Sequence, residues 1–114
     1  MKEIKAIIRP NKLPALRDAL IALPGFPGMA VSKVEGCSAP NRHVARHTIK
    51  DELTEYSPKV RIDIVAPDDQ VDTIFQLIID LAGTGHFGDG LVWVTDVAKV
   101  GFIFKDGQTL ETSG

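Results

Sequence analysis

The chain has 114 residues, of which 44% are hydrophobic and 25% are charged, a mixture that is typical of one soluble globular domain. A formal net charge of -2 gives nucleic acid no electrostatic reason to bind, and no apolar run approaches the roughly 20 residues that a membrane span requires. One cysteine, Cys37, excludes an internal disulfide, and the N-terminus does not resemble a signal peptide, so we expect a cytoplasmic protein without direct membrane insertion.

The first half of the chain predicts a strand, a helix and a second strand. Apolar and polar residues roughly alternate over residues 2–10, which indicates a strand. Asn11 can cap the helix that follows, and Pro14 is tolerated in its first turn. A turn rich in proline and glycine at 24–28 ends that helix, and residues 29–35 predict the next strand. The helix buries leucines at helical spacing: Leu13, Leu16, Leu20 and Leu23.

The second half repeats this order after a long connection. Residues 59–67 alternate cleanly and predict a strand. Asp68 is expected to cap a helix, with Asp69 and Asp72 favoured by the helix dipole, and Gly83 is expected to end it. The apolar face of this helix consists of Val71, Ile74, Phe75, Ile78 and Leu81.

A glycine turn over residues 83–90 leads into a strand around Val92-Trp93-Val94. Its glycines allow a positive φ, so the turn can either direct backbone N–H groups toward an anion or serve as an ordinary connection from helix to strand. Residues 97–114 form the C-terminal strand and tail. There the apolar residues Val97, Val100, Phe102 and Phe104 are expected to extend the sheet.

The two halves share a motif, since Ile7-Ile8-Arg9-Pro10-Asn11 is echoed 57 residues later by Ile64-Val65-Ala66-Pro67-Asp68. This βαβ–βαβ order predicts a single α+β domain over residues 1–114 with the ferredoxin-like fold, a four-stranded antiparallel sheet with two helices on one face. Trp93, Phe102 and Phe104 are too apolar to leave exposed on the open face. We therefore expect a closed homo-oligomer that covers it.

Longer stretches of the chain are similar to one known family. They are residues 1–13, Gly28-Met29, residues 58–69, Val71-Asp72-Thr73, residues 84–90 and Val92-Trp93-Val94. Over nearly its whole length the chain resembles the PII signal-transduction family, the trimeric regulators of nitrogen metabolism.

The resemblance implies a homotrimer, not an enzyme, that binds ATP or ADP in clefts between subunits and 2-oxoglutarate through a nucleotide-bound magnesium ion. A long T-loop, here about residues 37–57, would dock on a target such as a membrane transporter or a metabolic enzyme. The loop residues that we expect to meet this partner are Arg42, Arg46, Lys50, Asp51 and Glu52. The positions that match or nearly match the nucleotide cleft are Ile7, Gly36, Lys59, Asp63, Val65, Gly88, Asp89 and Gly90.

Four positions depart from the family pattern. Leu91 stands where the family has a phosphate-binding lysine, and Phe102 and Phe104 stand where it has two arginines. Pro40 replaces the glutamine that helps to place magnesium and 2-oxoglutarate. Each lost charge-assisted hydrogen bond is worth about 1.5–3 kcal/mol, so we expect weakened ATP binding and keep ATP, ADP and AMP as alternative ligands.

The loop also carries His43 and His47, spaced i, i+4, which would place both imidazoles on one face of a helix. Such a pair can bind a transition metal, with Cys37 or Glu55 as a further ligand. The neighbouring charges of Arg42 and Arg46 disfavour a cation, so two solvated loop histidines are the simpler explanation. Three functions follow: a PII-like regulator that senses an adenine nucleotide or a changed ligand, a metal-responsive trimer, and a structural trimer that has no ligand.

Overall fold

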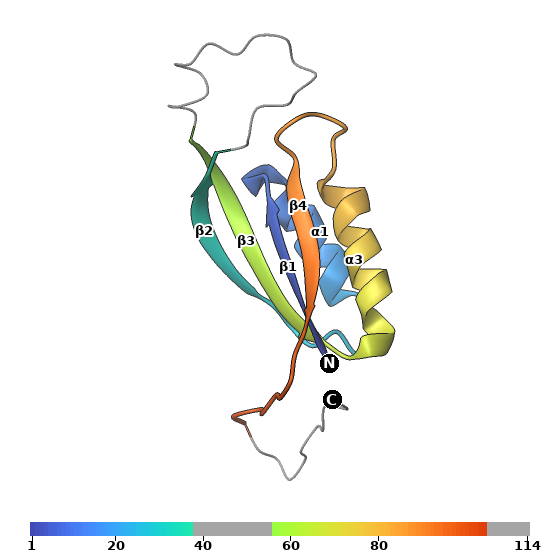
Figure 1. Cartoon of the computed structure of the whole chain (residues 1–114). Helices are drawn as coiled ribbons and strands as arrows, with labels where there is room; N and C mark the ends of the chain where they lie inside the picture. Colours follow the sequence, from blue (N-terminus) through green and yellow to red (C-terminus); the bar gives the residue numbers. More distant parts are fainter. Residues whose placement is uncertain (38–55, 105–114) are drawn as a thin grey trace.

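The computed structural model describes residues 1–37 and 56–104, which form one sheet and two helices (Figure 1). The helices and strands in chain order are β1 (Lys2–Ile8), the 3-10 helix η1 (Pro10–Lys12), α1 (Leu13–Ile21), β2 (Ala30–Gly36), β3 (Ser57–Ala66), α3 (Asp68–Ala82) and β4 (Gly90–Asp96).

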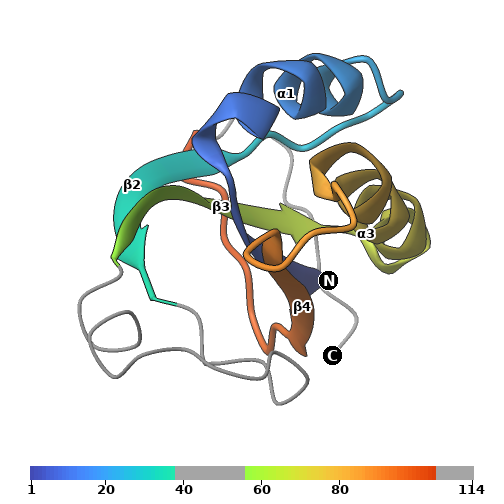
Figure 2. The same cartoon turned by 90° about the horizontal axis from the view of Figure 1, so that it is seen from above.

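The four strands form an antiparallel sheet in the order β2-β3-β1-β4. Both helices lie on the same face of this sheet, as the view from above shows (Figure 2). The expected ferredoxin-like fold is therefore confirmed, with each half contributing a strand, a helix and a second strand. Within the described residues, no helix combines the length and the apolar character that crossing a membrane requires.

The core lies between the sheet and the two helices. Ile4 pairs with Ile64 and Ala6 with Ile62, so the alternating apolar residues of β1 and β3 share the face that the helices cover. The predicted leucine face of α1 is confirmed, since Leu16 and Leu20 are fully buried. The buried residues of α3 are Val71, Ile74, Ile78 and Ala82, while Phe75 and Leu81 are only partly buried.

The helix starts differ from the two predicted caps. Asn11 lies inside η1, and the cap position of α1 is Lys12, which makes no side-chain cap. Asp68 is the first residue of α3 rather than its cap, because Pro67 precedes it and the Asp68 carboxylate instead pairs with the Met1 amino group at 3.0 Å. Asp69 lies in the first turn as expected, but Asp72 lies beyond it.

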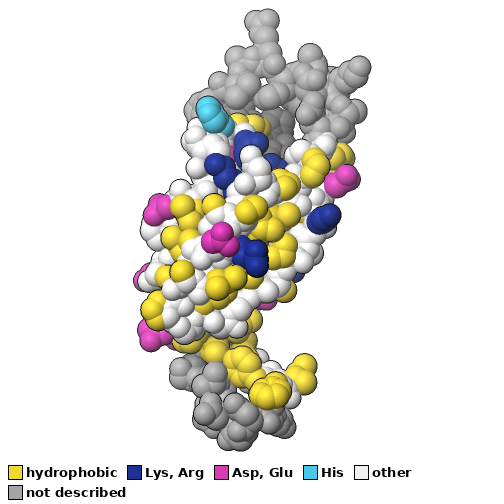
Figure 3. Space-filling model, turned by 180° about the vertical axis from the view of Figure 1, so that it is seen from behind, with side chains coloured by type: hydrophobic (Ala, Val, Ile, Leu, Met, Phe, Trp, Pro, Cys, Tyr) yellow, Lys and Arg dark blue, Asp and Glu magenta, His cyan; other side chains and the backbone are white. Residues whose placement is uncertain are grey.

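The sheet ends earlier than the sequence predicts. β4 stops at Asp96, which is the register partner of Lys2 at the start of β1. Beyond the bond from the Val97 amide to the Met1 carbonyl, the following residues have no strand of this sheet beside them. Residues 101–104 therefore leave the sheet, and Ile103 and Phe104 are 98% and 81% exposed. The side chains of this segment project from the lower end of the molecule (Figure 3).

The open face of the sheet carries the opposite set of alternating residues. Ile7 lies beside Leu91, and Lys5 lies beside Trp93. Across β1, Ile7 also faces Arg61, whose guanidinium pairs with Asp63 at 3.2 Å. This face is a mixture of apolar residues and charged pairs that neither helix covers.

Candidate functional site

One carboxylate, that of Asp89, holds the glycine turn between α3 and β4. Its Oδ2 accepts hydrogen bonds from the amides of Thr84 (2.7 Å) and Gly85 (3.0 Å). Its Oδ1 accepts from the Thr84 hydroxyl and from Arg9 Nε, the latter at 3.2 Å. The bonds from Thr84, followed by those from Arg9 and Gly85, hold the pKa of Asp89 well below its ordinary value.

The first backbone N–H groups of this turn are directed inward. The Thr84 and Gly85 amides do face an anion, but that anion is the carboxylate of Asp89. Thr84 and Gly85 lie in the same turn as Asp89, and Arg9 adds a bond from the end of β1. These bonds close the first part of the turn around the Asp89 carboxylate.

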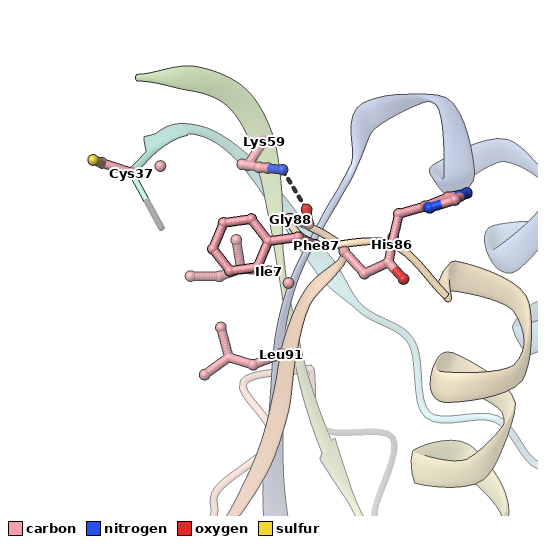
Figure 4. Close-up of a pocket in the computed structure, with 10 residues that line it drawn as sticks. Ile7, Cys37, Lys59, His86, Phe87, Gly88 and Leu91 are labelled. Atoms are coloured by element: carbon pink, nitrogen blue, oxygen red, sulfur yellow. Dashed lines mark hydrogen bonds between the residues drawn. The ribbon is translucent and has the colours of Figure 1, made fainter. Parts of the chain in front are cut away.

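Arg9 and Lys59 fix the turn to the sheet from two sides. Arg9, which follows β1, donates from Nη2 to the Phe87 carbonyl at 2.9 Å. Lys59, on β3, donates from Nζ to the Gly88 carbonyl at 2.7 Å (Figure 4). The Lys59 side chain is only 8% exposed, and its burial together with the nearby Arg9 lowers its pKa, against the opposing effect of Asp89.

Glycine is required at the point where the turn enters β4. Gly85, Gly88 and Gly90 have φ values of 80°, 96° and 103°, which confirms the positive φ predicted from the sequence. A Cβ on Gly90 would lie 1.8 Å from the carbonyl oxygen of Ile7. The backbone of β4 therefore approaches β1 more closely than any residue with a side chain permits.

A cavity of about 570 Å³ opens between this turn and the ends of β1, β2 and β3. Its lining residues are Ile7, Gly36, Cys37, Lys59, His86, Phe87, Gly88, Asp89, Gly90 and Leu91. Six of the eight positions expected in a nucleotide cleft lie here: Ile7, Gly36, Lys59, Gly88, Asp89 and Gly90.

The other two positions lie further along β3. Asp63 is opposite Lys5 and pairs with Arg61, and Val65 is opposite Glu3. Both side chains lie on the open face of the sheet, away from the cavity lining.

Phe87 is a lining residue that the sequence analysis did not assign to the site, because that assignment rested on the neighbouring glycines. Its ring lies on the same side as Ile7 and Leu91, whereas the imidazole of His86 points away from them (Figure 4). The sequence signal was present, since a large apolar residue at the exposed tip of a glycine turn has no place in the core of the same chain.

Several expected sites lie outside the described residues. They are the partner-binding positions Arg42, Arg46, Lys50, Asp51 and Glu52, the metal candidates His43, His47 and Glu55, and Pro40. In the described part of the chain, no group of three or more His, Cys, Asp or Glu residues could hold a metal ion. Phe102 and Phe104 leave β4 at the end of the sheet opposite the glycine turn (Figure 1).

Comparison with known proteins connects this geometry to one family. Nitrogen regulatory protein P-II matches residues 1–106. The chain is 44% identical over 100 residues to nitrogen regulatory protein P-II 1 of Escherichia coli strain K12, covering 88% of each chain. Over the same share of both chains it is 43% identical to nitrogen regulatory protein P-II of Klebsiella oxytoca and 38% identical to that of Pasteurella multocida.

Proposed function

Because this chain belongs to the nitrogen regulatory protein P-II family, we propose that it is a homotrimeric regulator that senses a small effector, an adenine nucleotide or a related ligand, in clefts between its subunits. The family consists of regulatory signalling proteins, not enzymes. The bound effector would set the conformation of the loop at residues 37–57. That loop would then control a target protein in nitrogen metabolism or transport.

The cavity beside the glycine turn is the observation that carries this proposal. It gathers six of the eight cleft positions from four segments of the chain that are distant in sequence. Hydrogen bonds that involve Asp89, Arg9 and Lys59 hold the turn that forms its floor. A preformed cavity of this kind binds a ligand without a large ordering cost.

The position of the cavity supports coupling between effector and loop. Gly36 and Cys37, where β2 ends and the loop begins, are part of its lining. Lys59 lines the cavity from the start of β3, close to where the chain returns from the loop. A ligand that contacts these residues would therefore bias both ends of the loop.

The sheet supports the trimeric part of the proposal. Its open face carries Ile7, Leu91 and Trp93 among charged pairs, and neither helix covers it. Since the cavity opens beside Ile7 and Leu91, a second subunit packed on this face would form one wall of the cleft.

Calorimetric titration of the purified protein with ATP, ADP, AMP and adenosine, with and without magnesium, tests the proposal. We expect micromolar binding of at least one of these ligands. Ile7→Trp would project a larger ring into the cavity and is expected to weaken that binding about tenfold or more, a loss of about 1.4 kcal/mol or more. Val31→Trp adds the same ring on the helix-covered face of β2 and should leave the affinity unchanged.

Sedimentation of both variants checks whether they assemble as the wild type does, since Ile7 lies on the face proposed to meet a second subunit. If none of the four ligands binds up to millimolar concentration, the proposal fails and the structural trimer without a ligand becomes the better description. A metal titration of the wild type and of the double variant His43→Ala with His47→Ala then separates that description from the metal-responsive one.

A further inference from the structure

One wall of the cavity is apolar and faces solvent in the isolated subunit. Ile7 on β1 and Leu91 on β4 are register partners on the open face, and Phe87 extends from the glycine turn beside them (Figure 4). Phe87 and Leu91 are 51% and 58% exposed. The wall therefore offers a flat apolar surface, including one aromatic ring, to whatever occupies the cavity.

The charged groups of the cavity balance one another. Among the lining residues that the structure describes, Lys59 and Asp89 are the only ones with a formal charge at neutral pH, apart from the titratable His86 and Cys37. Lys59 donates to the Gly88 carbonyl, and Asp89 accepts hydrogen bonds from the turn and from Arg9. The lining thus has one positive and one negative side chain, each already bonded within the protein.

Among the described residues of one subunit, a polyphosphate would find little to compensate its charge. Arg9, a second cation near the turn, is bonded to Asp89 and to the Phe87 carbonyl. The Thr84 and Gly85 amides, which could hold a phosphate, are bonded to the Asp89 carboxylate. Several negative charges placed beside that carboxylate would lose hydration without gaining an unbonded cation from the described part of the chain.

We infer that the cavity selects a flat, uncharged aromatic ligand of the nucleoside class, stacked on Phe87 and packed against Ile7 and Leu91, rather than a polyphosphate. This inference rests on the proposed function, because it assigns the ligand class of the same cavity. The backbone carbonyls of the glycine turn and the Lys59 ammonium would supply the few polar contacts that orient such a ligand.

Comparing adenosine with ATP in the same calorimeter tests the inference. We expect adenosine to bind at least as tightly as ATP. Phe87→Ala is expected to weaken adenosine binding roughly 10- to 100-fold, the range that loss of one stacking contact gives. ATP binding that is more than about tenfold tighter than adenosine binding would overturn the inference while leaving the proposed function intact.

A charge-gain variant sharpens the comparison. Leu91→Lys places an ammonium beside the cavity and should strengthen ATP binding roughly 10- to 100-fold, with adenosine binding nearly unchanged. Val31→Lys adds the same charge on the helix-covered face of β2 and should change neither affinity. The inference is wrong if Leu91→Lys leaves ATP affinity at the wild-type value. It is also wrong if neither adenosine nor ATP binds the wild type, and the proposed function fails as well only if ADP and AMP do not bind either.

Discussion

Gly90 and Ile7 approach so closely that a Cβ on Gly90 would lie 1.8 Å from the Ile7 carbonyl oxygen. Gly90 is the first residue of β4 and has a φ of 103°. The contact lets the chain pass directly from the glycine turn into β4, so that Leu91 lies beside Ile7 at the cavity. One backbone contact therefore positions both the edge strand and two residues of the candidate site.

Gly90→Ala should destabilise the fold strongly. The substitution combines an unfavourable positive φ with a clash that only a separation of β1 and β4 could relieve. We expect the free energy of unfolding, measured by urea denaturation, to fall by at least about 3 kcal/mol.

Gly28→Ala is the matched control for this substitution. Gly28 has a φ of 105°, nearly the value of Gly90, but a Cβ there would have no neighbour within 4 Å. It therefore introduces the backbone strain alone, which is worth about 1–2 kcal/mol. Equal losses in the two variants would contradict the role of the Ile7 contact.

Asp89→Asn should change how stability depends on pH. Hydrogen bonds from Thr84, Arg9 and Gly85 lower the pKa of Asp89 in the folded protein. The folded state therefore holds the proton less tightly than the unfolded chain does. The stabilisation is complete above the ordinary carboxyl value of 3.8 and is lost as the pH falls below it toward the lowered pKa of the folded state.

Urea midpoints measured between pH 2 and pH 7 check this prediction. The wild type should lose more stability on acidification than Asp89→Asn does, and the two curves should converge at the acid end. Asp72→Asn, which removes an exposed carboxylate from α3, should keep the steeper wild-type dependence. Parallel curves for the wild type and Asp89→Asn would show that the carboxylate does not act through its charge.

The fold was predictable because its periods are local properties of the sequence. The alternation in β3 and the leucine spacing in α1 each identified a buried face that the structure confirms. The three positive φ values of the glycine turn were predictable for the same reason, since only glycine adopts them without strain.

The bonds that hold the candidate site were not predictable in this way. Arg9 and Asp89 are 80 residues apart, and nothing near either residue in the sequence identifies the other as its partner. The carboxylate of Asp68 reads as a helix cap until the fold brings the Met1 amino group beside it. The end of β4 at Asp96 depends on where β1 begins, so the periodicity of the later apolar residues gave a wrong extension.

Leu20→Ala measures how much the helix layer contributes to stability. Leu20 lies on the buried face of α1 and is fully buried in the core. Truncating such a leucine to alanine lowers the free energy of unfolding by about 2–5 kcal/mol. The next residue is the matched control, because Ile21 is 57% exposed and Ile21→Ala should cost less than about 1 kcal/mol. Similar losses in thermal or urea unfolding would mean that the predicted leucine face is not what anchors α1.

Trp93→Glu should weaken assembly of the proposed trimer, because Trp93 lies on the open sheet face beside Lys5. If a second subunit covers this face, the substitution removes a large aromatic contact and buries a carboxylate in its place. Losses of about 2 kcal/mol or more per interface are typical for such an aromatic position.

Sedimentation velocity over a concentration series should show a trimer for the wild type and a shift toward monomer for the variant. Val31→Glu places the same charge on the opposite face of the sheet and should sediment as the wild type does. If Trp93→Glu remains fully trimeric at the lowest concentration and Val31→Glu dissociates, the subunits meet through the helix-covered side. The cavity would then lack the neighbouring wall that the proposed function requires.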